Sequence, residues 1–257
     1  MSTQLPTIEL SGMRLAKARG QEVLDHVFEE LSHGKGGWLI TANLDFLRRF
    51  CREPEMRALY EQADVTVADG MPLVWAARIQ GDRLPERVTG SSMVWSLASR
   101  ASAEGRTLYL LGGDEGTGDA AAQEFTRRSP KLTISGVSAP MFSNPPTEQE
   151  IADVKQLFAA DPPDILLVGL GSPKQEILIQ ALRKSLPGTW MIGVGISFSF
   201  VAGKVRRAPR WMQRSGLEWL HRLFQEPRRL ARRYLIDDIP FSIVLFSRAL
   251  GSRFRRK

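Results

Sequence analysis

The stretch Asp164-Ile-Leu-Leu-Val-Gly-Leu-Gly-Ser-Pro-Lys-Gln-Glu176 decides the fold class of this chain. An apolar run typical of a buried strand ends at Gly169 and Gly171, and Pro173 suits the first turn of a helix. That turn carries three polar side chains, Lys174, Gln175 and Glu176. Because the free N–H groups of a helix start attract phosphate and other anions, the stretch predicts a turn that binds a charged, hydroxylated ligand. An ordinary turn with polar surface side chains explains the same pattern.

Similar strand-like segments recur along the chain and alternate with helical patterns. The strand-like segments cover residues 38–42, 65–68, 107–111, 132–137, 165–169 and 190–194. The helical patterns cover residues 23–31, 46–62, 71–79, 92–104, 119–128, 147–160 and 174–185. This alternation predicts an α/β fold with a largely parallel sheet.

Polar and glycine residues follow nearly every predicted strand, at the edge where α/β sheets bind their ligands. They lie in residues 41–45, 69–72, 112–118, 171–176 and 193–203. Residues 112–118 read Gly-Gly-Asp-Glu-Gly-Thr-Gly, which differs from the dinucleotide fingerprint Gly-x-Gly-x-x-Gly. A nucleotide phosphate or sugar fits on such a loop, and a plain turn has the same sequence. We expect these segments to meet at one rim of the sheet.

Asp69 is the candidate general base of this rim. It directly follows the predicted strand 65–68 and precedes Gly70. A carboxylate that is partly withdrawn from water has a raised pKa, which suits it to accept a proton near neutral pH. The structural alternative is a helix N-cap, because Pro72 and an apolar helix follow.

Composition and cysteine content point to a cytoplasmic protein. The 257 residues are 43% hydrophobic and 25% charged, which is ordinary for a globular chain. Cys51 is the single cysteine, so no internal disulfide forms and a reducing compartment is expected. The N-terminus lacks the basic start and apolar core of a signal peptide. No uncharged apolar run approaches the roughly 20 residues that a spanning helix needs.

The sequence holds no motif for metal or nucleophilic catalysis. The three histidines are scattered along the chain, and neither Asp-x-Asp nor Gly-x-Ser-x-Gly occurs. We therefore expect no metal ion and no cofactor, and we exclude acyl transfer and metal-dependent hydrolysis.

The positive charge is concentrated in the tail. Residues 203–257 hold 15 lysines and arginines against 4 acidic residues, a balance of +11, whereas the first 202 residues hold 20 against 24, a balance of −4. Arginines alternate there with Trp211, Trp219, Phe224 and Tyr234. Such a segment is typical of the membrane interface and of phosphate binding. A solvated basic surface with a packed apolar face is the alternative, and nucleic-acid binding is not expected without a recognition motif.

Taken in order, the motifs resemble those of the WecG/TagA/CpsF glycosyltransferases of bacterial cell-surface polysaccharide synthesis. The motifs of the first half are Thr41-x-Asn43, Asp69-Gly70, Glu86-Arg-Val-Thr-Gly90, Leu111-Gly-Gly113 and Pro163-Asp-Ile-Leu166. Those of the second half are Gly169 to Glu176, Gly193-Val-Gly195, Ala202-Gly203, Arg207-Ala-Pro209, Gly216 to Arg222 and Glu226 to Leu230.

The resemblance implies a Rossmann-like core, residues 1–202, followed by a basic helical appendage, residues 203–257, that docks on the membrane and completes the active site. The implied reaction is an inverting, metal-independent transfer from a UDP-sugar to a monosaccharide on a polyprenyl diphosphate, with Asp69 as the base. The pocket residues that the resemblance implies are Thr41, Asn43, Arg87 and Gln175. The pattern of the chain itself adds Gly112, Gly113, Gly171, Lys174, Glu176 and Ser199 to the predicted donor and acceptor ligands. The arginines assigned to diphosphates and to an anionic membrane are Arg207, Arg214, Arg222, Arg228, Arg229, Arg232 and Arg233. The implied location is the inner face of the plasma membrane.

Two departures from the family pattern bear on the donor sugar. Ser199 stands where many members carry aspartate, and Met141 stands where many carry tyrosine. Both remove groups able to hold an N-acetyl sugar, and the serine form is similar to the xanthan-type β-1,4-glucosyltransferase branch of exopolysaccharide synthesis. We therefore expect UDP-glucose as donor and glucosyl-diphospho-polyprenol as acceptor, with N-acetylmannosaminyl or N-acetylmannosaminuronate transfer as the alternative. A nucleotide-binding oxidoreductase and a non-enzymatic membrane adaptor are the alternatives from other classes.

Overall fold

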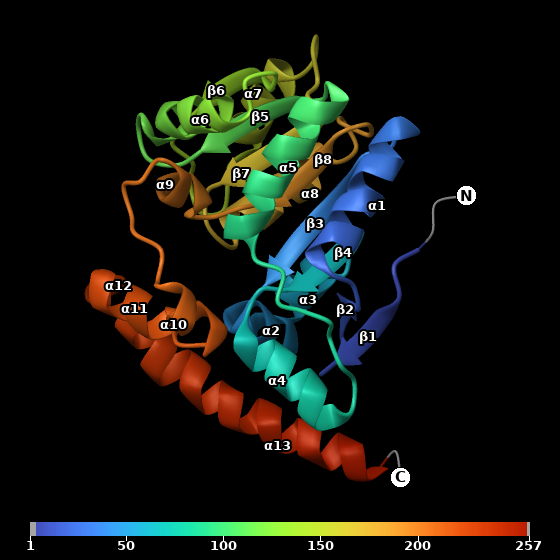
Figure 1. Ribbon diagram of the computed structural model, residues 1–257, viewed down its shortest axis with the longest axis vertical. Helices are drawn as coiled ribbons and strands as arrows, with labels where there is room; N and C mark the ends of the chain where they lie inside the picture. Colours follow the sequence, from blue (N-terminus) through green and yellow to red (C-terminus); the bar gives the residue numbers. More distant parts are fainter. Residues whose placement is uncertain (1–3, 256–257) are drawn as a thin grey trace.

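The computed structural model describes residues 4–255, without the side chains of Arg210, Arg214, Arg229 and Arg255. Six parallel strands form one sheet in the order β4-β3-β8-β7-β5-β6 (Figure 1). They are β3 (Gly37–Ala42), β4 (Val65–Ala68), β5 (Thr107–Gly112), β6 (Thr133–Ser138), β7 (Ile165–Gly169) and β8 (Trp190–Gly193). The predicted α/β fold is confirmed, and every strand boundary falls within one residue of its predicted position.

Helices cover both faces of this sheet. One face packs on α1 (Gly20–Ser32), α5 (Gly90–Glu104), α6 (Thr117–Arg128) and α9 (Ser197–Val201). The other packs on α2 (Leu44–Arg52), α3 (Pro54–Tyr60), α4 (Met71–Gln80), α7 (Glu148–Leu157) and α8 (Lys174–Leu182). Side chains alternate between the faces, with Leu39 in one cluster and Trp38 and Ile40 in the other. Burial on both faces explains why the strands read as continuous apolar runs.

Two features differ from the sequence prediction. An antiparallel hairpin of β1 (Thr7–Leu10) and β2 (Met13–Ala16) precedes the sheet and was not predicted. The helix expected over residues 46–62 is two helices, α2 and α3, because Pro54 begins the second. Proline has no N–H to continue a helix but suits its first turn.

After α9 the chain leaves the sheet and forms a helical tail. Its elements are α10 (Arg210–Arg214), α11 (Glu218–Gln225), α12 (Pro227–Ala231), the π-helix η1 (Arg232–Asp238) and α13 (Ile239–Arg255). Helix α13 runs along α4 (Figure 1) and buries Phe241, Leu245 and Ala249, one residue per turn. The proposed boundary between residues 202 and 203 falls between α9 and α10. None of the helices within residues 4–255 has the length and apolarity required to span a bilayer.

Candidate functional site

Asp69 lies at the carboxyl end of β4, as the sequence predicts. Its side chain accepts a hydrogen bond from the backbone N–H of Gly90, at the start of α5, with a distance of 3.1 Å. A Cβ added at Gly90 would lie 3.1 Å from Thr41 Oγ1, 3.9 Å from Asp69 Oδ2 and 3.9 Å from Ser197 Oγ. The ends of β3, β4 and β8 therefore bring two hydroxyls and a carboxylate around one glycine, whose missing side chain permits the close approach.

The environment of Asp69 suits a general base. Burial raises its pKa to about 7, while the Gly90 N–H and the guanidinium groups of Arg87 and Arg207 act in the opposite direction and Glu218 adds to the rise. The residue keeps partial exposure to solvent. A reachable carboxylate with a pKa near neutrality fits proton abstraction at physiological pH. That role for Asp69 remains a prediction.

Charged residues of the tail reach this rim. Arg87, in the loop before α5, pairs with Glu218 of α11, with 2.9 Å between Nη1 and Oε2. Arg207 places its Nε 3.4 Å from the other oxygen of Glu218. Its Nη1 and Nη2 donate to the hydroxyls of Ser92 and Thr89 at 3.1 and 3.2 Å. The tail is thus attached to the same segment, residues 87–92, that supplies the N–H bound by Asp69.

Asn43 is a second point of attachment. Its Oδ1 caps α2 by accepting hydrogen bonds from the backbone N–H groups of Asp45 and Phe46 at 3.0 and 3.3 Å. The same oxygen accepts a hydrogen bond from Arg233 Nη2 of η1 at 3.3 Å. Asn43 therefore combines a local capping role with a contact to the tail, and its predicted contact with a sugar is untested.

A buried ion network extends from this contact. Asp45 is 2% exposed and lies 2.6 Å from Arg48 Nη2, 3.3 Å from Arg49 Nε and 3.6 Å from Arg233 Nη2. Asp238 of η1 lies 3.8 Å from Arg48 Nε and 3.7 Å from Arg233 Nε. Burial acts to raise the pKa of Asp45, but the three arginines lower it overall, whereas burial prevails at Asp238 and raises its pKa to about 6. Charges of the core and of the tail therefore share one network.

The glycines after β5 are required for close packing of neighbouring strand ends. Gly112 has φ +94°, and a Cβ there would lie 2.7 Å from Leu170 Cδ2 and 3.1 Å from the carbonyl carbon of Gly169. The N–H of Gly113 donates to the carbonyl of Gly169 at 2.9 Å. A Cβ at Gly171 would meet no heavy atom within 4 Å, so this position faces open space. The predicted binding roles of Gly112, Gly113 and Gly171 are untested.

The polar residues that open α8 face inward. Gln175 and Glu176 are buried, and Gln175 Nε2 donates to Glu176 Oε1 at 2.6 Å. Gln175 Oε1 accepts a hydrogen bond from the Gly195 N–H at 3.0 Å, which holds the turn after β8. Lys174 Nζ donates to the carbonyl of Phe142 at 3.2 Å. All three thus have protein partners, and direct ligand contacts by them stay a prediction.

The remaining tail arginines lie along the outer part of the tail. Arg228 and Arg232 are exposed and Arg222 is partly buried. The predicted roles of Arg214 and Arg229 fall on side chains outside the described part of the structure. No group of three or more His, Cys, Asp or Glu side chains that could hold a metal ion occurs within residues 4–255. The metal independence expected from the sequence remains a prediction.

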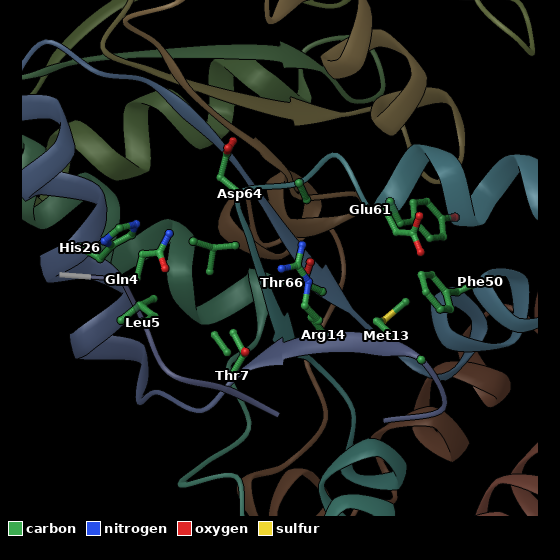
Figure 2. Close-up of a pocket in the computed structure, with 15 residues that line it drawn as sticks. Gln4, Leu5, Thr7, Met13, Arg14, His26, Phe50, Glu61, Asp64 and Thr66 are labelled. Atoms are coloured by element: carbon green, nitrogen blue, oxygen red, sulfur yellow. The ribbon is translucent and has the colours of Figure 1, made fainter. Parts of the chain in front are cut away.

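A cavity of about 400 Å³ lies elsewhere, between the β1–β2 hairpin and the amino end of β4. Figure 2 shows Arg14, His26, Asp64 and Thr66 among its lining side chains. None of the predicted site residues lines it. The rim at the carboxyl ends of the strands, and not this cavity, is therefore the candidate site.

Sequence reasoning missed four residues of the rim: Thr89, Ser92, Ser197 and Glu218. Thr89 and Ser197 lie in segments that the sequence analysis quoted, and their hydroxyls were a signal that could have been used. Glu218 is one of four acidic residues in a basic tail. An isolated acidic residue among many arginines indicates an ion pair, although it does not identify the partner.

One relative corrects the expected donor. A protein of Bacillus spizizenii (strain ATCC 23059 / NRRL B-14472 / W23), named N-acetylglucosaminyldiphosphoundecaprenol N-acetyl-beta-D-mannosaminyltransferase, is 29% identical over 219 residues, which are 85% of this chain and 83% of the relative. The glucosyltransferase prediction, with its xanthan-type branch, is wrong on this finding, which supports the N-acetylmannosaminyl alternative. Ser199 is only 8% exposed within α9, and Met141 is 91% exposed after β6. Ser199 is thus buried within a helix and Met141 points into solvent, so the identity of these two residues does not determine the donor sugar.

The comparison with known families covers nearly the whole chain. Residues 8–255 match the glycosyl transferase WecG/TagA/CpsF family. The match includes the sheet, the rim with Asp69 and the helical tail. The protein belongs to the WecG/TagA/CpsF family of glycosyltransferases.

Proposed function

We propose that the protein transfers N-acetylmannosamine from a UDP-sugar to N-acetylglucosamine on a polyprenyl diphosphate. The observation that carries this proposal is the similarity, over 85% of the chain, to a relative whose name states a transfer of this kind. The rim supplies a group suited to the chemistry, because Asp69 is a reachable carboxylate with a pKa of about 7.

The proposed reaction is a single displacement with inversion. Asp69 takes the proton of the acceptor hydroxyl as the oxygen of that hydroxyl forms a bond to the anomeric carbon of the donor. The bond between this carbon and the diphosphate oxygen breaks, and UDP leaves with the electron pair. One base is enough for such a step, and a positioned base is typically worth about 10² to 10⁴ in rate.

Arginine is the proposed source of positive charge for the leaving diphosphate. Arg87 uses Nη1 for its bond to Glu218, and a guanidinium carries five N–H donors, so others remain for an anion. Arg222, Arg228 and Arg232 of the tail are further candidates, since guanidinium groups bind phosphate in a bidentate manner. This assignment makes a divalent metal unnecessary.

The tail is the proposed membrane-docking appendage, residues 203–257. Large apolar side chains of η1 and α13 stay exposed: Leu235, Ile236, Ile239, Ile243, Val244, Leu250 and Phe254. Basic side chains accompany them, among them the exposed Arg232, Arg248 and Arg253. An apolar face flanked by arginines suits the surface of an anionic bilayer. Because the acceptor is lipid-linked, we place the enzyme on the cytoplasmic face of the plasma membrane.

A donor screen tests the reaction. The purified protein is incubated with N-acetylglucosaminyl diphosphate on a short polyprenyl chain and with either UDP-N-acetylmannosamine or UDP-glucose, and UDP release is followed. We expect kcat/KM to be at least about tenfold higher for the N-acetylated donor, because a site built to bind a polar group discriminates strongly against an analogue that lacks it. A preference for UDP-glucose contradicts the sugar assignment but not the family.

A flotation assay tests the docking surface. Ile236, Ile243 and Phe254 are replaced together by glutamine, and binding to vesicles that contain anionic lipid is compared with wild type. We expect the triple variant to bind more weakly, and added salt to weaken binding further. Leu157→Gln, which alters an apolar residue of α7 that is 48% exposed, is the matched control and should bind like wild type. Equal binding by the triple variant would contradict the docking role.

A further inference from the structure

Two tail residues and one segment of the core form a closed set of contacts beside Asp69. The set consists of Arg87, Thr89, Ser92, Arg207 and Glu218, and we call it the rim clasp. We propose that Arg207 and Glu218 are positioning residues, which hold Arg87 and the N–H of Gly90 in place around Asp69 without binding substrate themselves. The inference rests on the proposed transferase function and adds two residues to its machinery.

The geometry of Arg207 identifies it as an anchor. All three of its guanidinium nitrogens have protein acceptors: Nε bonds to Glu218, Nη1 to Ser92 and Nη2 to Thr89, at 3.4, 3.1 and 3.2 Å. Thr89 and Ser92 flank Gly90 at the start of α5. Three of its five N–H donors therefore hold protein oxygens around Gly90, which stabilises this turn and leaves two donors free, against four on Arg87. These contacts favour an anchoring role over the diphosphate role expected for Arg207 from the sequence.

The geometry of Glu218 makes it the link between the two arginines. One carboxylate oxygen lies 2.9 Å from Arg87 and the other 3.4 Å from Arg207. All three side chains are at most about one quarter exposed, with values of 18%, 15% and 24%. A charged pair in such a partly buried place holds its partners more firmly than an exposed salt bridge does. Arg87 is thereby fixed at the rim.

The clasp also sets the charge around the base. The charged groups that act on Asp69 are Arg87 from the loop before α5, Arg207 from the segment before α10 and Glu218 from α11. The negative charge of Glu218 offsets one of the two positive charges near Asp69. Without it, both guanidinium groups would favour the ionised form of Asp69 and make this carboxylate a weaker base. Without Arg207, the negative charge of Glu218 would weigh more and would disfavour the ionised form of Asp69.

These opposite effects give the test its discriminating readout. The pH dependence of kcat/KM is measured for Glu218→Gln and Arg207→Gln, with the donor and lipid acceptor of the proposed reaction. We expect the acidic limb of the profile to move to lower pH in Glu218→Gln and to higher pH in Arg207→Gln, with kcat lowered at least about tenfold in both. Arg206→Gln, which alters the exposed neighbouring arginine, is the matched control and should keep the wild-type profile.

Several outcomes would overturn the proposal. Loss of activity with an unmoved acidic limb in both variants makes the contacts merely structural. A lower KM for the UDP-sugar in Glu218→Gln shows instead that Glu218 occupies the place of a substrate phosphate. If a glutamine variant fails to fold, Glu218→Asp and Arg207→Lys take its place. Glu218→Asp and Arg207→Lys keep the charge but change the geometry. We therefore expect kcat to fall while the acidic limb of the pH profile stays in place. An unchanged kcat would contradict a positioning role for the two residues.

A second measurement does not depend on the reaction. Hydrogen–deuterium exchange of the peptides that cover residues 84–93 reports the turn itself. We expect faster exchange there in both glutamine variants and no change in Arg206→Gln. Unchanged exchange in both variants overturns the clasp. If the wild-type protein proves inactive with every UDP-sugar, the proposed function fails, whereas the exchange result still decides whether the tail orders this segment.

Discussion

Asp69 and Glu176 follow two strands of the same sheet, and burial raises the pKa of each to about 7. Their surroundings differ in access. Asp69 is partly exposed and faces two arginines and a glutamate, whereas Glu176 is 1% exposed and is hydrogen-bonded to Gln175. A raised pKa marks a carboxyl group removed from water, and only Asp69 of the two also keeps contact with solvent, which is why it is the proposed base.

Glu176 packs against the end of β8. A Cβ added at Gly193, the last residue of this strand, would lie 2.6 Å from Gln175 Nε2 and 3.1 Å from Glu176 Oε1, so the strand end packs directly on this pair. Burial raises the pKa of Glu176, and the nearby Ser172 hydroxyl and the Gln175 amide only partly oppose that rise. A buried carboxyl group that is protonated, and therefore neutral, is the less costly form in such a place.

The largest expected difference is in turnover. Asp69→Asn should lower kcat by about 10² to 10⁴, because the acceptor hydroxyl loses its base. Glu176→Gln keeps the shape of the side chain and the neutral charge of its protonated form, and should lower kcat less than about tenfold. Steady-state kinetics with unchanged circular dichroism as the folding control checks both. Equal losses of kcat in Asp69→Asn and Glu176→Gln would contradict the assignment of Asp69 as the base and of Glu176 as a structural group.

The pH dependence sharpens the same comparison. Because Asp69 accepts a proton only when it is ionised, kcat/KM should fall about tenfold per pH unit below its pKa of about 7 and level off above it. Glu176→Gln should leave that acidic limb in place. A wild-type profile that is flat between about pH 5 and pH 8 assigns the proton transfer to another group.

A packing variant tests the structural half of the comparison. Gly193→Ala places a methyl group against Gln175 and Glu176, and such overpacking typically costs about 1–3 kcal/mol of stability. We expect a lower Tm than for Gly188→Ala, where the nearest heavy atom to an added Cβ is 3.5 Å away. Equal melting temperatures would show that the end of β8 adjusts freely.

The smallest expected effect concerns metal ions. If the arginines of the rim and the tail supply the positive charge, an excess of EDTA should leave the initial rate of the wild-type enzyme unchanged. A loss that Mg²⁺ or Mn²⁺ restores would assign the diphosphate to a metal instead.

Much of the sheet could be predicted from the sequence, because each strand is a continuous apolar run bounded by glycine or polar residues. The segment that ends at Gly169 and the one that ends before Asp69 are examples. The β1–β2 hairpin was missed because its four-residue strands mix polar and apolar residues, whereas the equally short β4 and β8 are largely apolar. The break between α2 and α3 was visible in Pro54 but was not used.

The site was predicted only in part, for a physical reason. Position after a strand identified Thr41 and Asp69, because the ends of parallel strands meet. The pairing of Arg87 with Glu218 joins residues 131 positions apart, and no local pattern encodes it. The inward direction of Gln175 and Glu176 likewise depends on packing against the turn after β8. The donor prediction from Ser199 failed because sequence position alone did not show that this side chain is buried.

The ion network between α2 and η1 limits how the protein can be recombined with its relatives. Buried charges that lose their partners are strongly destabilising, so Asp45 and Arg48 of the core and Arg233 and Asp238 of the tail have to be inherited together. A chimera that carries the tail of another member on this core is therefore expected to fold poorly unless α2 is transplanted with it. Although the tail begins after the last strand, we do not expect it to behave as an exchangeable module.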